Sequence, residues 1–294
     1  MIYGYDFSLK AGASYFKSKQ CLNKMTKESK YYLSDEYTDS ANPVICLVKF
    51  VSKPFLISTL LGNLHFSSLY QFRMMETEGN DHKIGDTYEG IYPCDISKRS
   101  HKLTKEKFEP KFPYAKIHNW HMKPVATEKG YGLSDQDAKK VGLASFYVLR
   151  KSNFDNVNVS ADSLKENKMA LHKLNQMVLN MMHNFNQEGR IPVIVPMMKD
   201  VIIMFKQNSE YQDLVNYVDE KSPAESTIID KINENSMVAA FFKRNKYKEQ
   251  LEYRFINNME NINNTGLKHF KGLEHYIFPV RNEDLKNLRM SWVI

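Results

Sequence analysis

The sequence predicts an α+β protein in which a mixed or split β-sheet is flanked by helices. Short apolar runs with strand spacing occur, for example at residues 44–51, and a longer segment with helical spacing covers residues 161–187. The 294 residues are 42% hydrophobic, which is enough to build a sizeable core. We expect one main domain, residues 43–294, after a polar, Lys-rich and Tyr-rich N-terminal appendage, residues 1–42.

The main domain is expected to open with two strands joined by a helix. Residues 44–51 form an apolar run that is typical of a buried strand, and residues 53–61 predict a short connecting helix. Residues 63–68 alternate between apolar and polar side chains, which predicts a half-buried strand. Because side chains alternate along a strand, His65 and Ser67 should share one face.

The next segment concentrates charged and glycine residues more than any other part of the chain. Apolar spacing of three and four residues predicts a short helix in which Arg73 and Glu76 share a turn. Residues 85–90 then form a glycine-rich loop that carries Asp86 and Glu89. Two interpretations stay open: a ligand-binding loop, or a surface helix and turn with ordinary solvated charges.

Residues 92–135 are interrupted by four prolines and two glycines, which predicts a surface excursion without long regular elements. His118 and His121 lie three residues apart there, a spacing that suits two metal ligands on a helix. No third ligand has a diagnostic spacing, so ordinary loop histidines are the alternative. The chain has no GxSxG, GxxxxGK[ST], GxGxxG or HExxH motif, which removes the strongest motif routes to a hydrolase, NTPase, dehydrogenase or metalloprotease.

The middle of the chain predicts its clearest helix. Leucine, valine, methionine and phenylalanine repeat at three, four and seven residues over residues 161–187, and Gly189 follows as a stop. Residues 192–196 and 201–205 then predict two short strands, and residues 211–218 predict a short helix.

Further elements are expected toward the C-terminus. The sequence SPAE at residues 222–225 has the form of a capping box with proline at the first helical position, which predicts a helix through about residue 233. Residues 276–280 predict a last short strand, and residues 285–294 form an end segment that contains Trp292.

Two of the late strands are expected to surround a polar connection. Residues 238–243 and 251–256 have strand character, and residues 244–250 between them predict a hairpin-like connection. Glu252 and Arg254 then lie on the same side of the second strand. They can grip a polar ligand together, or they can form a salt bridge on a solvated face; both interpretations stay open.

Charge and cysteine usage indicate the setting in which the chain works. Lys and Arg exceed Asp and Glu by seven charges, which favours an anionic partner such as a nucleotide or nucleic acid. No apolar run approaches the roughly 20 residues that a membrane-spanning helix needs, and three widely spaced cysteines argue against a disulfide framework. We therefore expect a cytoplasmic protein with no membrane partner.

Two sequence motifs carry a resemblance to known proteins. The first reads GxLxFxSLxxFRxxE followed by GDxxEG, and the second reads FFKxxxYxxQxEYRF. The residues that carry the resemblance are Gly62, Leu64, Phe66, Ser67, Ser68, Leu69, Phe72, Arg73, Glu76, Gly85, Asp86, Glu89 and Gly90, and then Phe241, Phe242, Lys243, Tyr247, Gln250, Glu252, Tyr253, Arg254 and Phe255. In this order they resemble a broad group of largely uncharacterised bacterial and phage-borne proteins. That resemblance implies an α/β or α+β fold and genes near mobile elements and defence systems.

A more distant likeness is to the ADP-ribosyltransferase fold, in which a split sheet holds NAD. The likeness implies that Arg73 binds the pyrophosphate and that Glu252 supports the ribose as it gains positive charge. It also implies that His65 or Ser67 lies at the nicotinamide ribose and that Tyr70 stacks on nicotinamide. These roles rest on analogy between folds.

The resulting hypothesis is a phage-defence effector or counter-defence protein that binds a nucleotide-type ligand between residues 73–89 and the Glu252 strand. If the chain is catalytic, we expect ADP-ribosyl transfer or NAD cleavage, with NAD as the cofactor. The predicted catalytic residues are Glu252, Arg73 and Arg254, and the predicted ligand-binding residues are His65, Ser67, Tyr70, Glu76, Asp86 and Glu89.

Two hypotheses from other classes stay open. The first is a non-catalytic module that binds nucleic acid or a protein through a basic surface, with an affinity that falls steeply as salt increases. The second is a nuclease whose magnesium ion is held by Glu76, Asp86 and Glu89, because carboxylate oxygens suit that ion.

Overall fold

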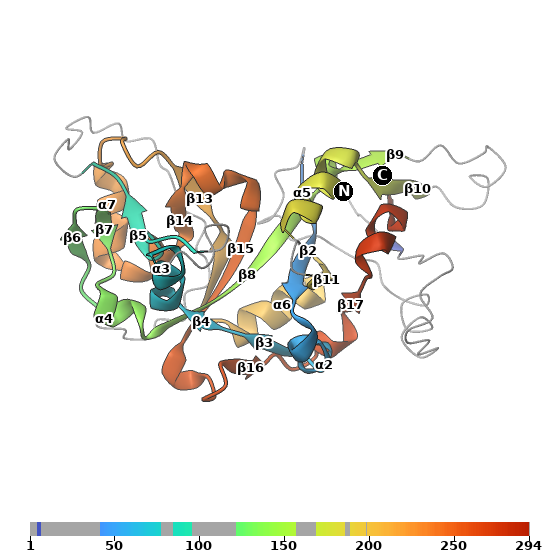
Figure 1. Ribbon diagram of the computed structural model, residues 1–294, viewed down its shortest axis with the longest axis horizontal. Coiled ribbons are helices and arrows are strands. Elements are labelled where there is room, and N and C mark those ends of the chain that lie inside the picture. The colour runs from blue at the N-terminus through green and yellow to red at the C-terminus, as the bar shows by residue number, and fades with distance from the viewer. Residues whose placement is uncertain are drawn as a thin grey trace. The chain divides into compact units, whose positions relative to one another are not determined.

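The computed structural model describes residues 5–6, 42–77, 85–95, 122–156, 169–185, 189–197 and 199–293 (Figure 1). The fold is α+β, as predicted. The chain divides into two compact units: unit 1 comprises Met1–Gly62, Val148–Met204 and Lys271–Ile294, and unit 2 comprises Asn63–Tyr147 and Phe205–Phe270. The predicted appendage, residues 1–42, lies outside the described residues except for residues 5, 6 and 42, so its boundary stays a prediction.

The described strands of unit 1 form two antiparallel arrangements. In one, β11 (Ile191–Pro196) lies between β2 (Val44–Val51) and β17 (Phe278–Pro279). The other has the order β1 (Tyr5–Asp6), β18 (Arg289–Val293), β10 (Met169–Leu174) and β9 (Phe154–Asn156). The helices in the described residues of this unit are η2 (Lys53–Phe55), α2 (Leu56–Leu60), η3 (Lys151–Asn153), α5 (Gln176–Phe185), η8 (Leu273–His275) and η9 (Asn282–Asn287).

Unit 2 is built around β15 (Glu252–Asn258), which pairs antiparallel with β12 (Tyr211–Leu214) on one side and β8 (Val141–Arg150) on the other. The remaining strands are β3 (Asn63–His65) with β16 (Leu267–His269), β4 (Ser67–Ser68) on β8, β5 (Ile91–Pro93) with β7 (Gly130–Gly132) and β6 (Val125–Thr127), and β13 (Asn216–Val218) with β14 (Phe242–Arg244). The helices are α3 (Leu69–Thr77), α4 (Asp135–Ala138), α7 (Ser226–Glu234), η5 (Ser236–Phe241), η6 (Asn245–Gln250) and η7 (Met259–Asn261). Strand β8 and helix α6 (Lys199–Asn208) each run from one unit into the other.

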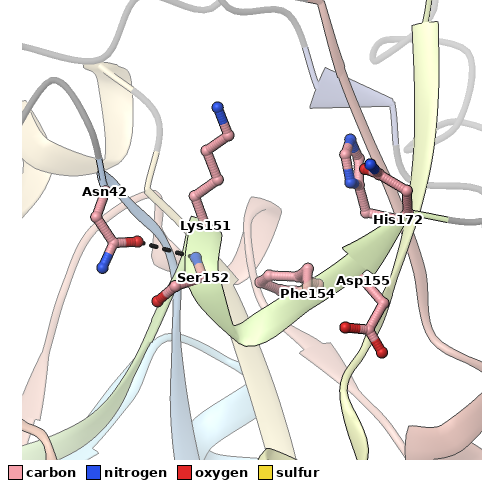
Figure 2. A pocket seen from close by; sticks show the side chains of 7 residues that line it. Asn42, Lys151, Ser152, Phe154, Asp155 and His172 are labelled. Atoms are coloured by element: carbon pink, nitrogen blue, oxygen red, sulfur yellow. Dashed lines mark hydrogen bonds between the residues drawn. The ribbon is translucent and has the colours of Figure 1, made fainter.

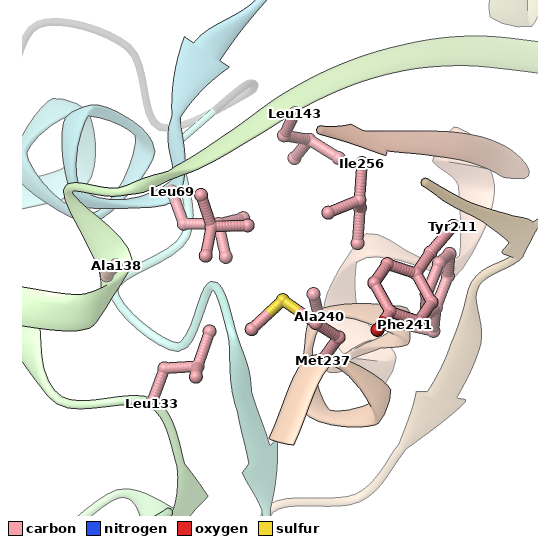
Figure 3. Packing of buried hydrophobic residues seen from close by; sticks show 10 residues of the cluster. Leu69, Leu133, Ala138, Leu143, Tyr211, Met237, Ala240, Phe241 and Ile256 are labelled. Atoms are coloured by element: carbon pink, nitrogen blue, oxygen red, sulfur yellow. The ribbon is translucent and has the colours of Figure 1, made fainter. Parts of the chain in front are cut away.

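Both faces of β15 are buried, but they differ in character. On one face Tyr253 and Phe255 pack with other aromatic rings, including Phe205, whose ring centroid lies 4.4 Å from that of Phe255. On the other face Ile256 belongs to a hydrophobic cluster that α3, β8, β12 and η5 complete (Figure 3). The cluster consists of Leu69, Leu133, Ala138, Val141, Leu143, Tyr211, Met237, Ala240, Phe241 and Ile256. Glu252 and Arg254 lie on this second face, so the polar site begins where the cluster ends.

The helix predicted over residues 161–187 is wrong for part of its length, because residues 169–174 form strand β10 and the helix α5 begins at Gln176. The side chain of Asn175 accepts a hydrogen bond from the N–H of Val178, which caps the helix at that point. Residues 161–168 lie outside the described part of the chain. Residues 169–174 are a strand because they pair with β18 and β9, and the local spacing of apolar residues does not show these partners.

Two neighbouring predictions are also wrong. Residues 201–205, predicted as a strand, lie within helix α6, where Ile203 is exposed between buried neighbours. Residues 211–218, predicted as a helix, form strands β12 and β13, because β12 pairs with β15. Tertiary pairing therefore overrides the local spacing.

The helix predicted through about residue 233 is confirmed, since α7 (Ser226–Glu234) ends there, but the capping box at residues 222–225 is wrong. Helix α7 begins at Ser226, and its N-cap residue Glu225 makes no side-chain cap bond. Residues 222–224 instead pair with Asp95, whose N–H donates to the carbonyl of Ser222 at 2.9 Å. This pairing holds the segment extended and moves the start of the helix.

The late strands are partly as predicted. β15 confirms the strand at residues 251–256, while residues 238–241 belong to helix η5 and residues 245–250 to helix η6. β14 runs parallel to β13 and does not form a hairpin with β15. The strand at residues 44–51 and the helical segment that follows it are confirmed. None of the helices in the described ranges has the length and apolar character needed to cross a membrane.

Candidate functional site

The glycine-rich loop after α3 is a buried turn. Asp86 is 0% and Glu89 is 1% exposed, so the interpretation of these two side chains as ordinary solvated charges is wrong. The N–H of Glu89 donates to the carbonyl of Asp86 at 2.9 Å, which closes the turn. Gly90 has φ +74°, and a Cβ at Gly85 would lie 2.6 Å from the main-chain nitrogen of Glu76. Both glycines are therefore required by the backbone.

Four buried charged side chains form a closed ring in unit 2, which we call the ion ring: Glu89, Lys243, Glu252 and Arg254. The Lys243 Nζ lies 2.7 Å from Glu252 Oε1 and 3.1 Å from Glu89 Oε1. The Arg254 Nε lies 2.9 Å from Glu252 Oε2, and its Nη2 lies 2.7 Å from Glu89 Oε2. Each cation thus bridges the same two carboxylates, and the ring as a whole is neutral.

Uncharged groups bind three members of the ion ring, Lys243, Arg254 and Glu252. Lys243 Nζ also donates to Gln250 Oε1 at 2.5 Å, and Arg254 Nη1 donates to the carbonyl of Ala240 at 2.5 Å. The hydroxyl of Ser145 donates to Glu252 Oε2 at 3.1 Å. A buried ionic group is tolerated when its lone pairs and protons are satisfied in this way.

The two carboxyl groups of the ring have opposite pKa shifts. Burial alone would raise the pKa of Glu252, but Arg254 and Lys243 outweigh it and lower this pKa to about 2. Burial raises the pKa of Glu89, and the same two cations only partly offset it. Glu252 is therefore ionised throughout the physiological range. It is also the ring member nearest to solvent, because its side chain is 10% exposed against 2% or less for the others.

Arg73 holds the turn from the other side. Its Nε donates to the carbonyl of Glu89 at 2.7 Å, its Nη2 donates to the carbonyl of Leu133 at 3.0 Å, and its Nη1 pairs with Asp135 at 2.5 Å. Arg73 and Arg254 therefore meet at one residue, Glu89, where one binds the main chain and the other the carboxylate. Arg73 thus connects the turn to residues 133 and 135. To bind a pyrophosphate, its guanidinium group would have to break one of these three contacts.

A second ionic cluster fixes the start of the turn. Arg244 lies 2.5 Å from Glu76 and 2.6 Å from Asp86, and its guanidinium carbon lies 4.3 Å from the centre of the Tyr88 ring. The hydroxyl of Tyr247 donates to the carbonyl of Gly85 at 2.9 Å. The polar residues of the early and late motifs thus bind one another.

The structure brings together most, but not all, of the predicted site residues. Arg73, Glu76, Asp86, Glu89, Glu252 and Arg254 lie in these two connected clusters. Ser67 lies on β4 opposite Leu143, and His65 lies on β3 opposite Leu267. Tyr70 packs against the hydrophobic cluster, with Lys139 Nζ 4.6 Å from its ring centre. The roles predicted for His65, Ser67 and Tyr70 stay predictions.

Sequence reasoning missed several members of the site. Lys243 and Gln250 stand in the late motif, so their shared motif could have indicated them. Arg244 stands beside Lys243 but outside the motif. Ser145 joins only through strand pairing, since it lies opposite Arg254 in the register of β8 and β15. No local pattern signals such a residue.

The carboxylates predicted to hold magnesium are not arranged for it. Glu76 and Asp86 bind Arg244, and Glu89 binds Arg254 and Lys243. Within the described part of the chain, no three His, Cys, Asp or Glu side chains are grouped as metal ligands. The His118 and His121 pair lies outside the described residues.

Unit 1 contains a separate open pocket of about 610 Å³ (Figure 2). Its lining comes from η3, β9, β10 and Asn42, which lies two residues before β2: Asn42, Lys151, Ser152, Phe154, Asp155, Asn156 and His172. The side chain of Asn42 accepts a hydrogen bond from the N–H of Ser152 at 2.9 Å, which fixes one wall. Burial and the nearby Lys151 lower the pKa of His172, so this imidazole is neutral at physiological pH.

Comparison with known proteins found no matching family model, no matching curated protein and no matching solved structure.

Proposed function

We propose that unit 2 binds a nucleotide-type ligand where β15 begins, and that it acts on NAD by ADP-ribosyl transfer or by releasing nicotinamide. In this proposal the chain is a phage-defence effector or a counter-defence protein, in keeping with the resemblance of its two motifs. The observation that supports the proposal most is the state of Glu252. It is ionised, held in one orientation by Lys243, Arg254 and Ser145, and nearest to solvent in the ion ring.

The chemistry of NAD requires such a group. As the bond to nicotinamide breaks, positive charge develops on the ribose, and a fixed carboxylate stabilises that charge without first having to reorient. Glu252 stands at the first position of its strand, where the sheet face ends. A ligand bound at this end would approach Glu252, the ring member nearest to solvent.

The cost of the ion ring is a second reason to expect a function. Burying ions costs several kcal/mol each, and well-packed apolar side chains of similar volume are often as stabilising as a buried ion pair. Strongly shifted ionisable groups gather at functional sites more often than elsewhere, although structural networks also shift them. The pKa of Glu89 is raised and that of Glu252 is lowered, which is a difference expected at a functional site.

The alternative is a non-catalytic module that binds nucleic acid or a protein. It is favoured by the closure of the ion ring, because Lys243 and Arg254 are committed to internal partners and the ring carries no net charge. Under this alternative the ring stabilises the fold, and the formal charge of +7 provides attraction to an anionic partner.

Incubation with NAD separates the two proposals. Wild type, Glu252→Gln and the control Glu234→Gln are compared, with and without cell extract, and nicotinamide and protein-bound ADP-ribose are measured by mass spectrometry. Glu234 is an exposed carboxylate at the end of α7, so its substitution should leave the reaction unchanged. Release or transfer that disappears only in Glu252→Gln is the expected result.

No reaction in any of the three proteins would overturn the catalytic proposal. The alternative then predicts that the protein binds nucleic acid. The logarithm of the association constant should fall linearly as the logarithm of the salt concentration rises. That affinity should be the same in wild type and in Glu252→Gln.

A further inference from the structure

The open pocket of unit 1 has the size of a small-molecule site. Its volume of about 610 Å³ falls within the range of roughly 300–1,000 Å³ that is usual for such sites. All of its lining residues belong to unit 1, whereas the ion ring belongs to unit 2. The function proposed for the ion ring therefore leaves this pocket without a role.

One wall of the pocket is helix η3, whose main chain is held by hydrogen bonds. The Lys151 N–H donates to the carbonyl of Pro43 at 3.0 Å, and the Ser152 N–H donates to Asn42 Oδ1 at 2.9 Å. The carbonyl of Ser152 accepts a hydrogen bond from Asn175 Nδ2 at 3.1 Å. The side chains of Lys151 and Ser152 thus project from an ordered main chain, which reduces the entropy cost of binding a ligand.

The floor and the opposite wall come from strands β9 and β10. His172 lies directly opposite Asn156 in their register, and Leu174 lies opposite Phe154, so Phe154, Asn156 and His172 share one sheet face. In the view of Figure 2 the Phe154 ring lies between Lys151 and His172. Phe154 is 8% and His172 is 4% exposed, so both are held by packing. The pocket therefore combines an apolar floor with polar walls.

The side of the pocket that Lys151 and His172 share is positively charged. Lys151 is exposed, and its charge acts on His172, because it contributes with burial to the lowered pKa of that imidazole. Asp155 also belongs to the lining, but it occupies the alternate position of β9, in register with Lys173. Figure 2 shows its carboxylate pointing away from Lys151 and His172. The groups that face this side are thus mainly hydrogen-bond donors.

We propose that the pocket binds a small organic oxyanion, a phosphate or a carboxylate carried on an apolar group, with its charge between Lys151 and His172. The Lys151 ammonium, the Ser152 hydroxyl and a ring N–H of His172 can donate to the oxyanion, and such charge-assisted hydrogen bonds are the stronger ones. The apolar group contacts Phe154, because the pocket is larger than a bare oxyanion. This inference does not depend on the reaction proposed for unit 2.

Binding of four small probes by calorimetry tests the chemistry of the ligand. Phenyl phosphate or benzoate should bind saturably, whereas phenol, which has the same ring without the oxyanion, should not. Binding of phenyl phosphate alone identifies a phosphate, and binding of benzoate alone identifies a carboxylate. Inorganic phosphate should bind more weakly than phenyl phosphate, because it lacks the ring that contacts Phe154.

A pair of lysine substitutions tests the assigned contact. Lys151→Met should weaken binding of the anionic probe by about 10–100-fold, the value of one hydrogen bond to a charged group. Lys173→Met is the matched control, because Lys173 is exposed on β10 beside His172 but lies on the opposite sheet face. It should change the affinity by less than about twofold, since solvent and salt screen its charge. Circular dichroism checks the fold of both variants.

A nuclear magnetic resonance titration locates the bound probe. The amide resonances of residues 151–156 and 172 should shift as the anion is added, and those of β15 should not. Glu252→Gln should bind the anion as wild type does, whatever the result of the NAD assay, so the two proposals can fail separately.

Several results would overturn the inference. It is wrong if neither anion binds at concentrations up to about 10 mM, or if phenol binds as tightly as the anions. Equal affinities of Lys151→Met and Lys173→Met would contradict the assigned contact, and shifts confined to β15 would place the anion elsewhere. Equal affinities for inorganic phosphate and phenyl phosphate would contradict the contact between the apolar group and Phe154.

Discussion

Lys243 and Arg254 each bridge Glu89 and Glu252, so removing either cation leaves two buried carboxylates with a single cation. Removing one cation should lower the free energy of unfolding by more than the intact ion ring contributes to it. The reason is that a buried carboxylate without its partner keeps its full desolvation cost. The same reasoning explains why Gln250 and Ser145 matter, since each pairs with a polar atom of the ring that water cannot readily reach.

Lys243→Met is therefore expected to lower the free energy of unfolding by about 3–5 kcal/mol. Lys248→Met is the matched control, because Lys248 is exposed on the adjacent helix η6, and it should change stability by no more than about 0.5 kcal/mol. Urea unfolding followed by circular dichroism measures both. Equal effects of the two substitutions would show that the ion ring does not contribute as described.

Glu252 should also make the free energy of unfolding depend on pH in the acid range. Its pKa is lowered from 4.5 to about 2 in the folded state, so its contribution is fully present above pH 4.5 and is lost as pH falls from 4.5 toward 2. Glu252→Gln should be less stable than wild type at pH 7, and its stability should fall less steeply across that acid range. Unfolding curves at a series of pH values check this, and parallel acid limbs in the two proteins would contradict the assigned pKa.

At the scale of elements, the turn after α3 depends on glycine. Gly90 has φ +74°, and an added Cβ would lie 2.9 Å from Leu69 Cδ1 and 3.4 Å from Arg73 Nη2. Gly189 has a similar φ of +66°, but an added Cβ there meets nothing within 4 Å. Alanine substitutions at these two positions therefore distinguish the effect of backbone strain from the effect of side-chain crowding.

Gly90→Ala should destabilise the protein more than Gly189→Ala, which carries the strain of a positive φ alone, about 1–3 kcal/mol. The additional loss of stability in Gly90→Ala reflects displacement of the turn away from α3. The same displacement should also reduce activity with NAD. Thermal unfolding and the nicotinamide assay measure the two effects. Equal losses of stability would mean that the turn moves freely away from α3.

The local spacing of apolar residues predicted an element correctly where the tertiary contacts favour the same secondary structure. The mainly apolar run at residues 44–51 is a strand buried along most of its length, and α3 follows its three-and-four spacing. Prediction failed where a partner far along the chain decides the structure. β12 is a strand because β15 pairs with it, and residues 222–224 are extended because Asp95 binds them.

At the scale of the whole molecule, the candidate site joins segments that are distant in sequence. Arg254 and Glu89 are 165 positions apart, yet they share one ion pair. The motifs predicted most of the charged residues, but only the fold shows that Arg73 and Arg254 meet at Glu89.

We propose above that Glu252, the ion-ring member nearest to solvent, acts on NAD. The most direct measurement is a time course of nicotinamide release from NAD by equal amounts of wild type, Glu252→Gln and Glu234→Gln, each confirmed as folded. We predict steady release by wild type and Glu234→Gln and none above background by Glu252→Gln. Equal release by all three proteins, or none by wild type, would contradict the claim.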